Sequence, residues 1–178
     1  IALQTPWAKR YIEDLGVRWS KPICTGPLLF AKKYESGGSS KDNGKSYKIE
    51  LQASLFPELN GKKIVLHAST PKSQSALRLF VYETIDEYIR NINSLIKVVT
   101  RMNNVHLIIR FRPVRDLNLA EFKELLVESE SFTVRTDGSI DRFLLASNLL
   151  LSYGSAVIEE ALQNKIPVLQ YDFDGKYC

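Results

Sequence analysis

Residues Leu149–Asp172 read LLLSYGSAVIEEALQNKIPVLQYD, and this stretch decides the fold. An apolar run ends at Ser152, Gly154 offers a tight turn, and a helix is expected to begin near Ser155. A second apolar run, Ile166–Gln170, follows the helix. Strand, tight turn, helix and strand in this order are typical of one unit of a parallel sheet, because parallel neighbours need a crossover between them.

The same alternation continues upstream. Short apolar runs with turn residues around them predict five strands: Ile64–His67, Val105–Ile109, Phe132–Val134, Leu149–Leu151 and Ile166–Gln170. Between them, helices are predicted at Ile85–Met102, after a capping box of Asn118 and Glu121, after Ser139, and at Ala156–Gln163. This order predicts an α/β fold, a Rossmann-like parallel sheet with helices on both faces.

The first sixty residues follow a different pattern. Thr5-Pro6 and Gly16 bracket a predicted helix, and Lys21–Phe30, with its two prolines, predicts an extended connection. Glu35–Ser46 is rich in Gly, Ser, Lys and Asp and predicts a linker or mobile loop. Tyr47–Ala53 alternates polar and apolar residues and predicts an edge strand or an arm.

Composition excludes several classes of protein. No run approaches the roughly 18 apolar residues of a membrane span, and the first residues lack a signal-peptide pattern. Two cysteines and two histidines are too few for a metal site or a disulfide framework and indicate a reducing compartment. No nucleic-acid-binding motif is present, and aromatic residues do not interleave with the basic ones.

The charge is uneven along the chain. Residues 1–63 carry 11 Lys and Arg against 6 Asp and Glu, residues 64–119 carry 8 against 4, and residues 120–178 carry 5 against 10. A basic surface of this kind suits an anionic lipid, glycan or phosphate, but an unevenly charged solvated surface is the favoured interpretation. Peripheral contact with a membrane therefore stays open.

Ligands of parallel α/β sheets bind beyond the carboxyl ends of the strands. There, the backbone N–H groups at the predicted helix start and the hydroxyls of Ser152 and Ser155 suit a phosphate or diphosphate. Glu159 and Glu160 lie one turn further on, where a carboxylate accepts hydrogen bonds from ribose hydroxyls. The alternative is a plain strand, turn and helix with Ser155 as N-cap and two exposed glutamates.

The segment SYGSAVIEEALQNKIPVL resembles the nucleotide-sugar-binding segment of GT-B-fold glycosyltransferases and of the related UDP-N-acetylglucosamine 2-epimerases. The resemblance covers roughly residues 60–178, and the last forty are its specific part. It implies that Gly154, Ser155 and Ala156 face the diphosphate of a donor and that Glu160, rather than Glu159, binds the ribose. Asn148 stands where many members of the family have Asp.

Other motifs resemble the family more weakly. Ser69-Thr70-Pro71-Lys72 is placed where donor domains present Ser69, Thr70 and Lys72 to phosphates. The run Ile108–Pro113 is similar to a strand that ends in His-Pro in capsule-polymerising and glycerophosphate-transferring members, and Arg112 replaces the histidine. Arginine keeps a cationic phosphate contact but does not shuttle protons at neutral pH, so no acid or base role is carried over to it.

The resemblance also implies a domain plan and a function. Cys24-Thr25-Gly26-Pro27 is similar to the end of an acceptor-side domain, so residues 1–30 are expected to be its remnant, 31–61 a linker or arm, and 62–178 the donor-binding domain. The implied function is the donor-binding part of a glycosyltransferase that moves a sugar or glycerophosphate from an activated nucleotide in surface polysaccharide synthesis. Its catalytic groups are unknown, and the chain alone is expected to be inactive.

The implied partners are a nucleotide-activated donor and, through the other domain, a glycan or lipid-linked acceptor, with no metal or other cofactor and no nucleic acid. The implied location is the cytoplasm or the inner face of its membrane. Two other functions stay open. One is a nucleotide-sugar 2-epimerase, against which the scarcity of titratable residues at the loop ends argues, and the other is a non-catalytic nucleotide-binding or interaction module.

Overall fold

The computed structural model describes residues 2–3, 6–16, 23–24, 41–68, 83–114, 117–152 and 155–171. The chain divides into two compact units, Ile1–Gly44 and Lys45–Cys178, which are described separately. Within the described residues, no helix is both long enough and apolar enough to cross a membrane.

The first unit contains one helix and a short pair of strands. Strand β1 (Ala2–Leu3) pairs in parallel with β2 (Ile23–Cys24). Helix α1 (Pro6–Asp14) begins at the predicted proline, and Gly16 takes a left-handed φ of 72° just beyond it, a conformation that glycine adopts without steric penalty. The helix predicted from Pro6 to Gly16 is confirmed, and Ile23–Cys24 is extended as expected.

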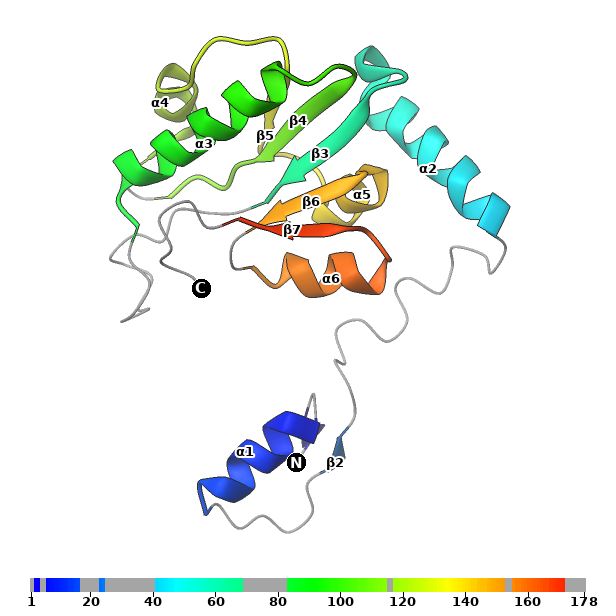
Figure 1. Cartoon of the computed structure of the whole chain (residues 1–178), viewed down its shortest axis with the longest axis vertical. Helices are drawn as coiled ribbons and strands as arrows, with labels where there is room; N and C mark the ends of the chain where they lie inside the picture. The colour runs from blue at the N-terminus through cyan, green and yellow to red at the C-terminus, as the bar shows by residue number, and fades with distance from the viewer. Residues whose placement is uncertain are drawn as a thin grey trace. The chain divides into compact units, whose positions relative to one another are not determined.

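The second unit is built on a five-stranded parallel sheet (Figure 1). Its strands are β3 (Lys63–His67), β4 (Val105–Arg110), β5 (Phe132–Arg135), β6 (Leu149–Ser152) and β7 (Val168–Gln170). The spatial order is β5-β4-β3-β6-β7, with every neighbouring pair parallel. All five predicted strands are present, and the Rossmann-like fold class is confirmed.

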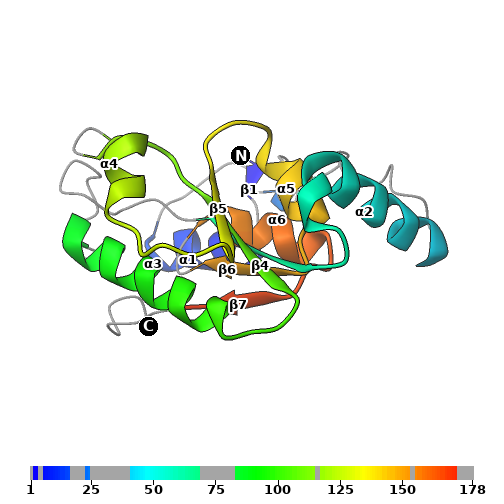
Figure 2. The same cartoon turned by 90° about the horizontal axis from the view of Figure 1, so that it is seen from above.

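Helices cover both faces of this sheet. They are α2 (Lys41–Leu55), α3 (Ile85–Thr100), α4 (Leu119–Glu124), α5 (Ile140–Ala146) and α6 (Val157–Gln163), with a 3₁₀ turn, η1 (Pro57–Leu59), before β3. In Figure 2 the sheet lies between α3 on one side and α5 on the other. The predicted capping box of Asn118 and Glu121 is confirmed, since each side chain accepts from the other's backbone N–H.

Alternation along each strand produces two cores. In β4, Leu107 and Ile109 pack with α3 and α4, whereas Ile108 packs on the opposite face with α5 and α6. Both cores contain fully buried aromatic rings, Phe122 in the first and Phe143 in the second. The central strands β3, β4 and β6 are largely buried on both faces and read as continuous apolar runs, which is why they could be recognised in the sequence.

The prediction of an edge strand at Tyr47–Ala53 is wrong, because these residues lie in α2. Of the alternating apolar set, Leu51 is buried, but Tyr47 and Ile49 are 50% and 65% exposed. Leu51 in the helix and Phe56, the residue directly after it, are buried, and both pack in the second core. The part of the predicted linker that the structure describes, 41–46, also belongs to α2.

The compact second unit therefore begins at Lys45, ahead of the start at 62 expected from the strand pattern. Two amide side chains tie α2 to the sheet. Gln52 Nε2 donates to the carbonyl of Ala146 at 2.6 Å and to Asn148 Oδ1 at 3.3 Å. Asn148 Oδ1 also accepts from the backbone N–H of Ile64 at 2.9 Å. Asn148, directly before β6, thus joins α2, β3 and β6.

Candidate functional site

A cavity of ≈ 220 Å³ opens at the carboxyl ends of the parallel strands. Its lining includes Ala68, which follows β3, the segment from Arg110 to Pro113 at the end of β4, and Thr136, which follows β5. Ile140 at the start of α5, and Ser155 and Val157 at the start of α6, also line it. Two of the predicted phosphate-binding residues, Arg112 and Ser155, therefore line one cavity.

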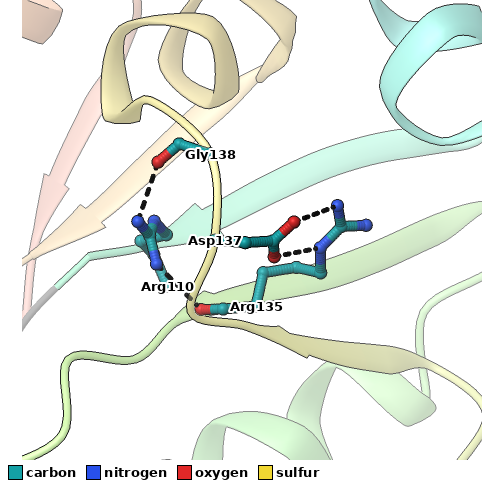
Figure 3. A network of polar contacts seen from close by, with 4 residues as sticks. All are labelled: Arg110, Arg135, Asp137 and Gly138. Carbon is teal, nitrogen blue, oxygen red and sulfur yellow. Dashed lines mark hydrogen bonds and ion pairs between the residues drawn. The ribbon is translucent and has the colours of Figure 1, made fainter.

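Two arginines end neighbouring strands at this edge. Arg110 of β4 and Arg135 of β5 are register partners, so their Cα atoms lie side by side. Arg110 is held by its own neighbourhood: Nη1 donates to the carbonyl of Arg135 at 3.2 Å and Nη2 to the carbonyl of Gly138 at 2.9 Å (Figure 3). These bonds fix the 135–138 turn against the end of β4.

Arg135 has a different partner. Its Nε and Nη2 donate to the two carboxylate oxygens of Asp137 at 3.0 and 3.1 Å, a bidentate pair (Figure 3). These hydrogen bonds lower the pKa of Asp137. Asp137 thus compensates Arg135 first, and more positive than negative charge remains among Arg110, Arg112, Arg135 and Asp137.

The electrostatics of Arg110 reflect this excess. Burial lowers the pKa of its guanidinium, the carboxylate of Asp137 raises it, and the charges of Arg112 and Arg135 lower it further. A guanidinium stays charged at neutral pH despite such a shift. Arg112 is exposed beside the cavity. An anion placed there would lower the repulsion among the three cations.

The aromatic ring of Phe143 forms a rigid base beneath the two paired arginines. The guanidinium carbons of Arg110 and Arg135 lie 5.6 and 5.7 Å from its ring centre, within the range of a cation–π contact. Phe143 is itself 1% exposed and packs at 5.6 Å against Phe56. Cations held over a buried ring keep a fixed position, which favours binding of an anion of defined geometry.

The other predicted residues are spread more widely. Ser152 is fully buried, and its hydroxyl donates to the carbonyl of Ala68 at 3.3 Å, so it joins β6 to the end of β3 and does not line the cavity. Ala156 is exposed just before α6, and the hydroxyl of Ser155 accepts from the N–H of Val157 at 3.4 Å. Ser69, Thr70, Lys72 and Gly154 lie outside the described residues.

The two glutamates of α6 differ in exposure. Glu159 is exposed and Glu160 is half-buried in the first turn of the helix. Neither lines the cavity. The ribose-binding role of Glu160 therefore stays a prediction.

His67 lies in β3 and is fully buried, as expected of a histidine in a central strand. Burial lowers its pKa to about 4, so it is neutral at physiological pH. The described residues that line the cavity include no histidine and no carboxylate. Within the described ranges, no group of three or more His, Cys, Asp or Glu residues is placed to hold a metal ion.

No protein-family model matches the chain, and no curated protein matches it. Among solved structures, the chain is similar to the wall teichoic acid polymerase TagF soaked with CDPG, with a TM-score of 0.48 and 12% sequence identity. The match covers 97% of this chain and 39% of that one. A similarity of this degree identifies neither a family nor an activity, and the fold class rests on the strand order above.

Sequence reasoning singled out Arg112 but missed the partnership of Arg110 with Arg135. A signal was present, because each residue directly follows a predicted apolar run, in IIRFRP and FTVRT. Strand ends that carry the same cation meet only if the two strands are neighbours in register. That register, Arg110 opposite Arg135, is supplied by the structure.

Proposed function

We propose that this chain is the donor-binding part of a glycosyltransferase that transfers a sugar or glycerophosphate from an activated nucleotide in surface polysaccharide synthesis. One observation carries the proposal. The cavity at the carboxyl edge of the sheet is lined by Arg110 and Arg112 together with Ser155, which belongs to the segment that resembles a nucleotide-sugar site. The carboxyl edge is where α/β sheets bind such ligands.

The cavity volume of ≈ 220 Å³ lies below the roughly 300–1,000 Å³ typical of sites that enclose a whole ligand of drug size. It suits a diphosphate with the rest of the donor outside it. In this arrangement Arg112 and Ser155 contact the phosphate oxygens, and Arg110 adds charge from behind. Charge-assisted bonds from guanidinium to phosphate are among the stronger hydrogen bonds in proteins.

The chemistry that these groups supply is electrostatic. As the bond between donor group and diphosphate breaks, negative charge accumulates on the leaving phosphate, and fixed cations stabilise it. Within the part of the lining that the structure describes, no group titrates near neutral pH, so the proposal assigns these residues no proton transfer. Activation of the acceptor is assigned to residues outside this cavity.

Isothermal titration with UDP, CDP and CMP tests the diphosphate assignment. We expect UDP or CDP to bind, and CDP to bind more tightly than CMP because CMP lacks the second phosphate. Absence of binding by all three, with the fold intact by circular dichroism, would refute the proposal.

A matched pair of variants locates the binding. Arg112→Gln should weaken binding of the preferred diphosphate by roughly 10- to 100-fold, the equivalent of one charge-assisted hydrogen bond. Arg101→Gln removes another exposed arginine, the C-cap of α3, which does not line the cavity. It should change the affinity less than about twofold, as expected of a distant surface charge. Equal losses in both variants would indicate non-specific attraction by net charge.

The role of Glu160 is tested separately. In a donor domain Glu160→Ala should weaken binding of a nucleotide but leave that of inorganic diphosphate unchanged, because only the nucleotide carries a ribose. The neighbouring Glu159→Ala is the control. Weakening by Glu159→Ala alone would contradict the proposed assignment of the two carboxylates.

A further inference from the structure

A second and larger cavity, of ≈ 550 Å³, lies at the opposite edge of the sheet. It is bounded by α2, by the turn before β3 and by Asn148 before β6. The first cavity lies at the carboxyl ends of the strands, whereas this one lies at the amino ends of β3 and β6. Since β3 has five residues at about 3.3 Å each, the two edges are roughly 15 Å apart.

Three lysines line this second cavity: Lys48 of α2, Lys62 and Lys63. Among the described residues, its lining includes no aspartate or glutamate. The three charges come from two segments of the chain that the fold brings together. Like charges gathered without a carboxylate in the same wall repel one another, and an anion among them would relieve the repulsion.

The pKa of Lys48 reflects repulsion from a neighbouring lysine. Burial lowers the pKa of its ammonium, and the charge of Lys63 lowers it further. Its Nζ donates to the carbonyl of Ser147, the C-cap of α5, which accounts structurally for one of its three donors. A helix cap does not explain why Lys62 and Lys63 stand at the same cavity.

The remaining wall is apolar. Phe56 and Ile64 are each 1% exposed and form its floor. Ile49, at its mouth, is 65% exposed, and Ala53 beside it on α2 is also exposed. A large exposed aliphatic side chain next to three cations suits a ligand that joins a negative group to an apolar one.

We propose that this cavity binds a phosphate group, with Lys62 and Lys63 as its principal cations and the exposed face of Ile49 and Ala53 as the contact for whatever the phosphate carries. Two sources share this chemistry: the head group of an anionic lipid and a soluble phosphate ester. The site is distinct from the proposed donor site and does not depend on it.

The test uses the full chain with two probes. Glycerol 3-phosphate is titrated in solution, and vesicles of phosphatidylglycerol are compared with vesicles of phosphatidylcholine by co-sedimentation at about 0.1 M salt, where charges further apart than about 10 Å are screened. Binding of the soluble ester identifies a soluble source, and binding of phosphatidylglycerol vesicles without it identifies a lipid head group. Binding of neither probe overturns the proposal.

The decisive variant is the double substitution Lys62→Gln with Lys63→Gln. At about 1 kcal/mol for each lysine near an anionic membrane, it should weaken vesicle binding roughly 30-fold, and glycerol 3-phosphate binding should fall in the same direction. The matched control, Lys97→Gln with Lys123→Gln, removes two exposed lysines of α3 and α4 and should change either affinity less than threefold. Equal losses in the two pairs would overturn the site.

A third variant keeps the test informative if the lysine pair unfolds. Ala53→Trp adds a large side chain at an exposed position of the cavity mouth without changing any charge. It should reduce binding of the preferred probe at least fivefold while the melting temperature stays the same. Unchanged binding with Trp at this position would place the phosphate elsewhere on the surface and overturn the proposal.

Discussion

Replacing Arg110 with Met should lower the stability of the second unit, whereas the same change at Arg112 should not. Arg110 donates to the carbonyls of Arg135 and Gly138 and lies 5.6 Å from the ring centre of Phe143. Arg112 is exposed at the cavity. Of these two arginines at the end of β4, Arg110 thus stabilises the structure of the site, and Arg112 is available to a ligand.

The size of the effect follows from these contacts. Each hydrogen bond to a carbonyl contributes about 1 kcal/mol net, since Arg110 is only half-buried. The contact with Phe143 contributes about 0.5–1 kcal/mol. Relief of the repulsion with Arg112 and Arg135 offsets part of this sum, which leaves about 2 kcal/mol. In a domain of this size that corresponds to a fall in melting temperature on the order of 8 °C.

Urea unfolding followed by circular dichroism measures the difference. We expect Arg112→Met to stay within about 0.5 kcal/mol of the parent chain, as do most surface substitutions. Arg110→Lys keeps the charge but cannot donate to two carbonyls from a rigid fork, so it should fall between the parent and Arg110→Met. Equal stabilities of the two Met variants would refute the division of roles.

Three further predictions concern buried or strained positions. His67 has a pKa of about 4 in the fold against about 6.5 in the unfolded chain. Its contribution to the free energy of unfolding is complete above pH 6.5 and is lost as pH falls toward 4, by about 3 kcal/mol. Between pH 7 and pH 4.5, the free energy of unfolding should therefore fall less in His67→Gln than in the parent chain. Gly138 has a φ of 77°, and a Cβ there would lie 2.9 Å from Phe143 Cε2. Gly138→Ala should therefore lower the free energy of unfolding by about 1–3 kcal/mol in urea titrations, and an unchanged or higher value would contradict this prediction. Asn148→Ala should cost about 1–2 kcal/mol because the N–H of Ile64 loses its acceptor, whereas Asn148→Asp should be nearly neutral in the same assay; equal losses would contradict the acceptor role.

The parallel sheet could be predicted because its central strands, β3, β4 and β6, are largely buried on both faces. Residues such as Leu107 and Ile108 are both fully buried, on opposite sides, and such strands stand out as unbroken apolar runs between turns. Their ends were less certain: β7 begins at Val168 rather than Ile166. Strand ends depend on which neighbour supplies hydrogen bonds, and that information is not local.

Helix α2 could not be predicted, because its local apolar pattern matches a strand and its stabilising contacts are distant in the sequence. Its alternating Tyr47, Ile49 and Leu51 match a strand over a short window, yet only Leu51 is buried. The helix is held by contacts made far along the chain, since Gln52 donates to Ala146 and Lys48 to Ser147. Tertiary contacts of this kind override local preference, and they also create the second cavity.

The candidate donor site was predictable at its sequence motif but not in its charge. Arg112 and Ser155 were recognised from short motifs, and the fold brings them to one cavity. The arrangement of Arg110, Arg135 and Asp137 depends on the register of β4 with β5, which places two arginines side by side, and on the 135–138 turn, which supplies only one carboxylate to them. A phosphate is attracted by the net positive charge of this cluster and not by any single arginine. The affinity of this edge for anions therefore depends on strand pairing. A substitution that shifts β5 by one residue would therefore weaken anion binding even with every arginine retained.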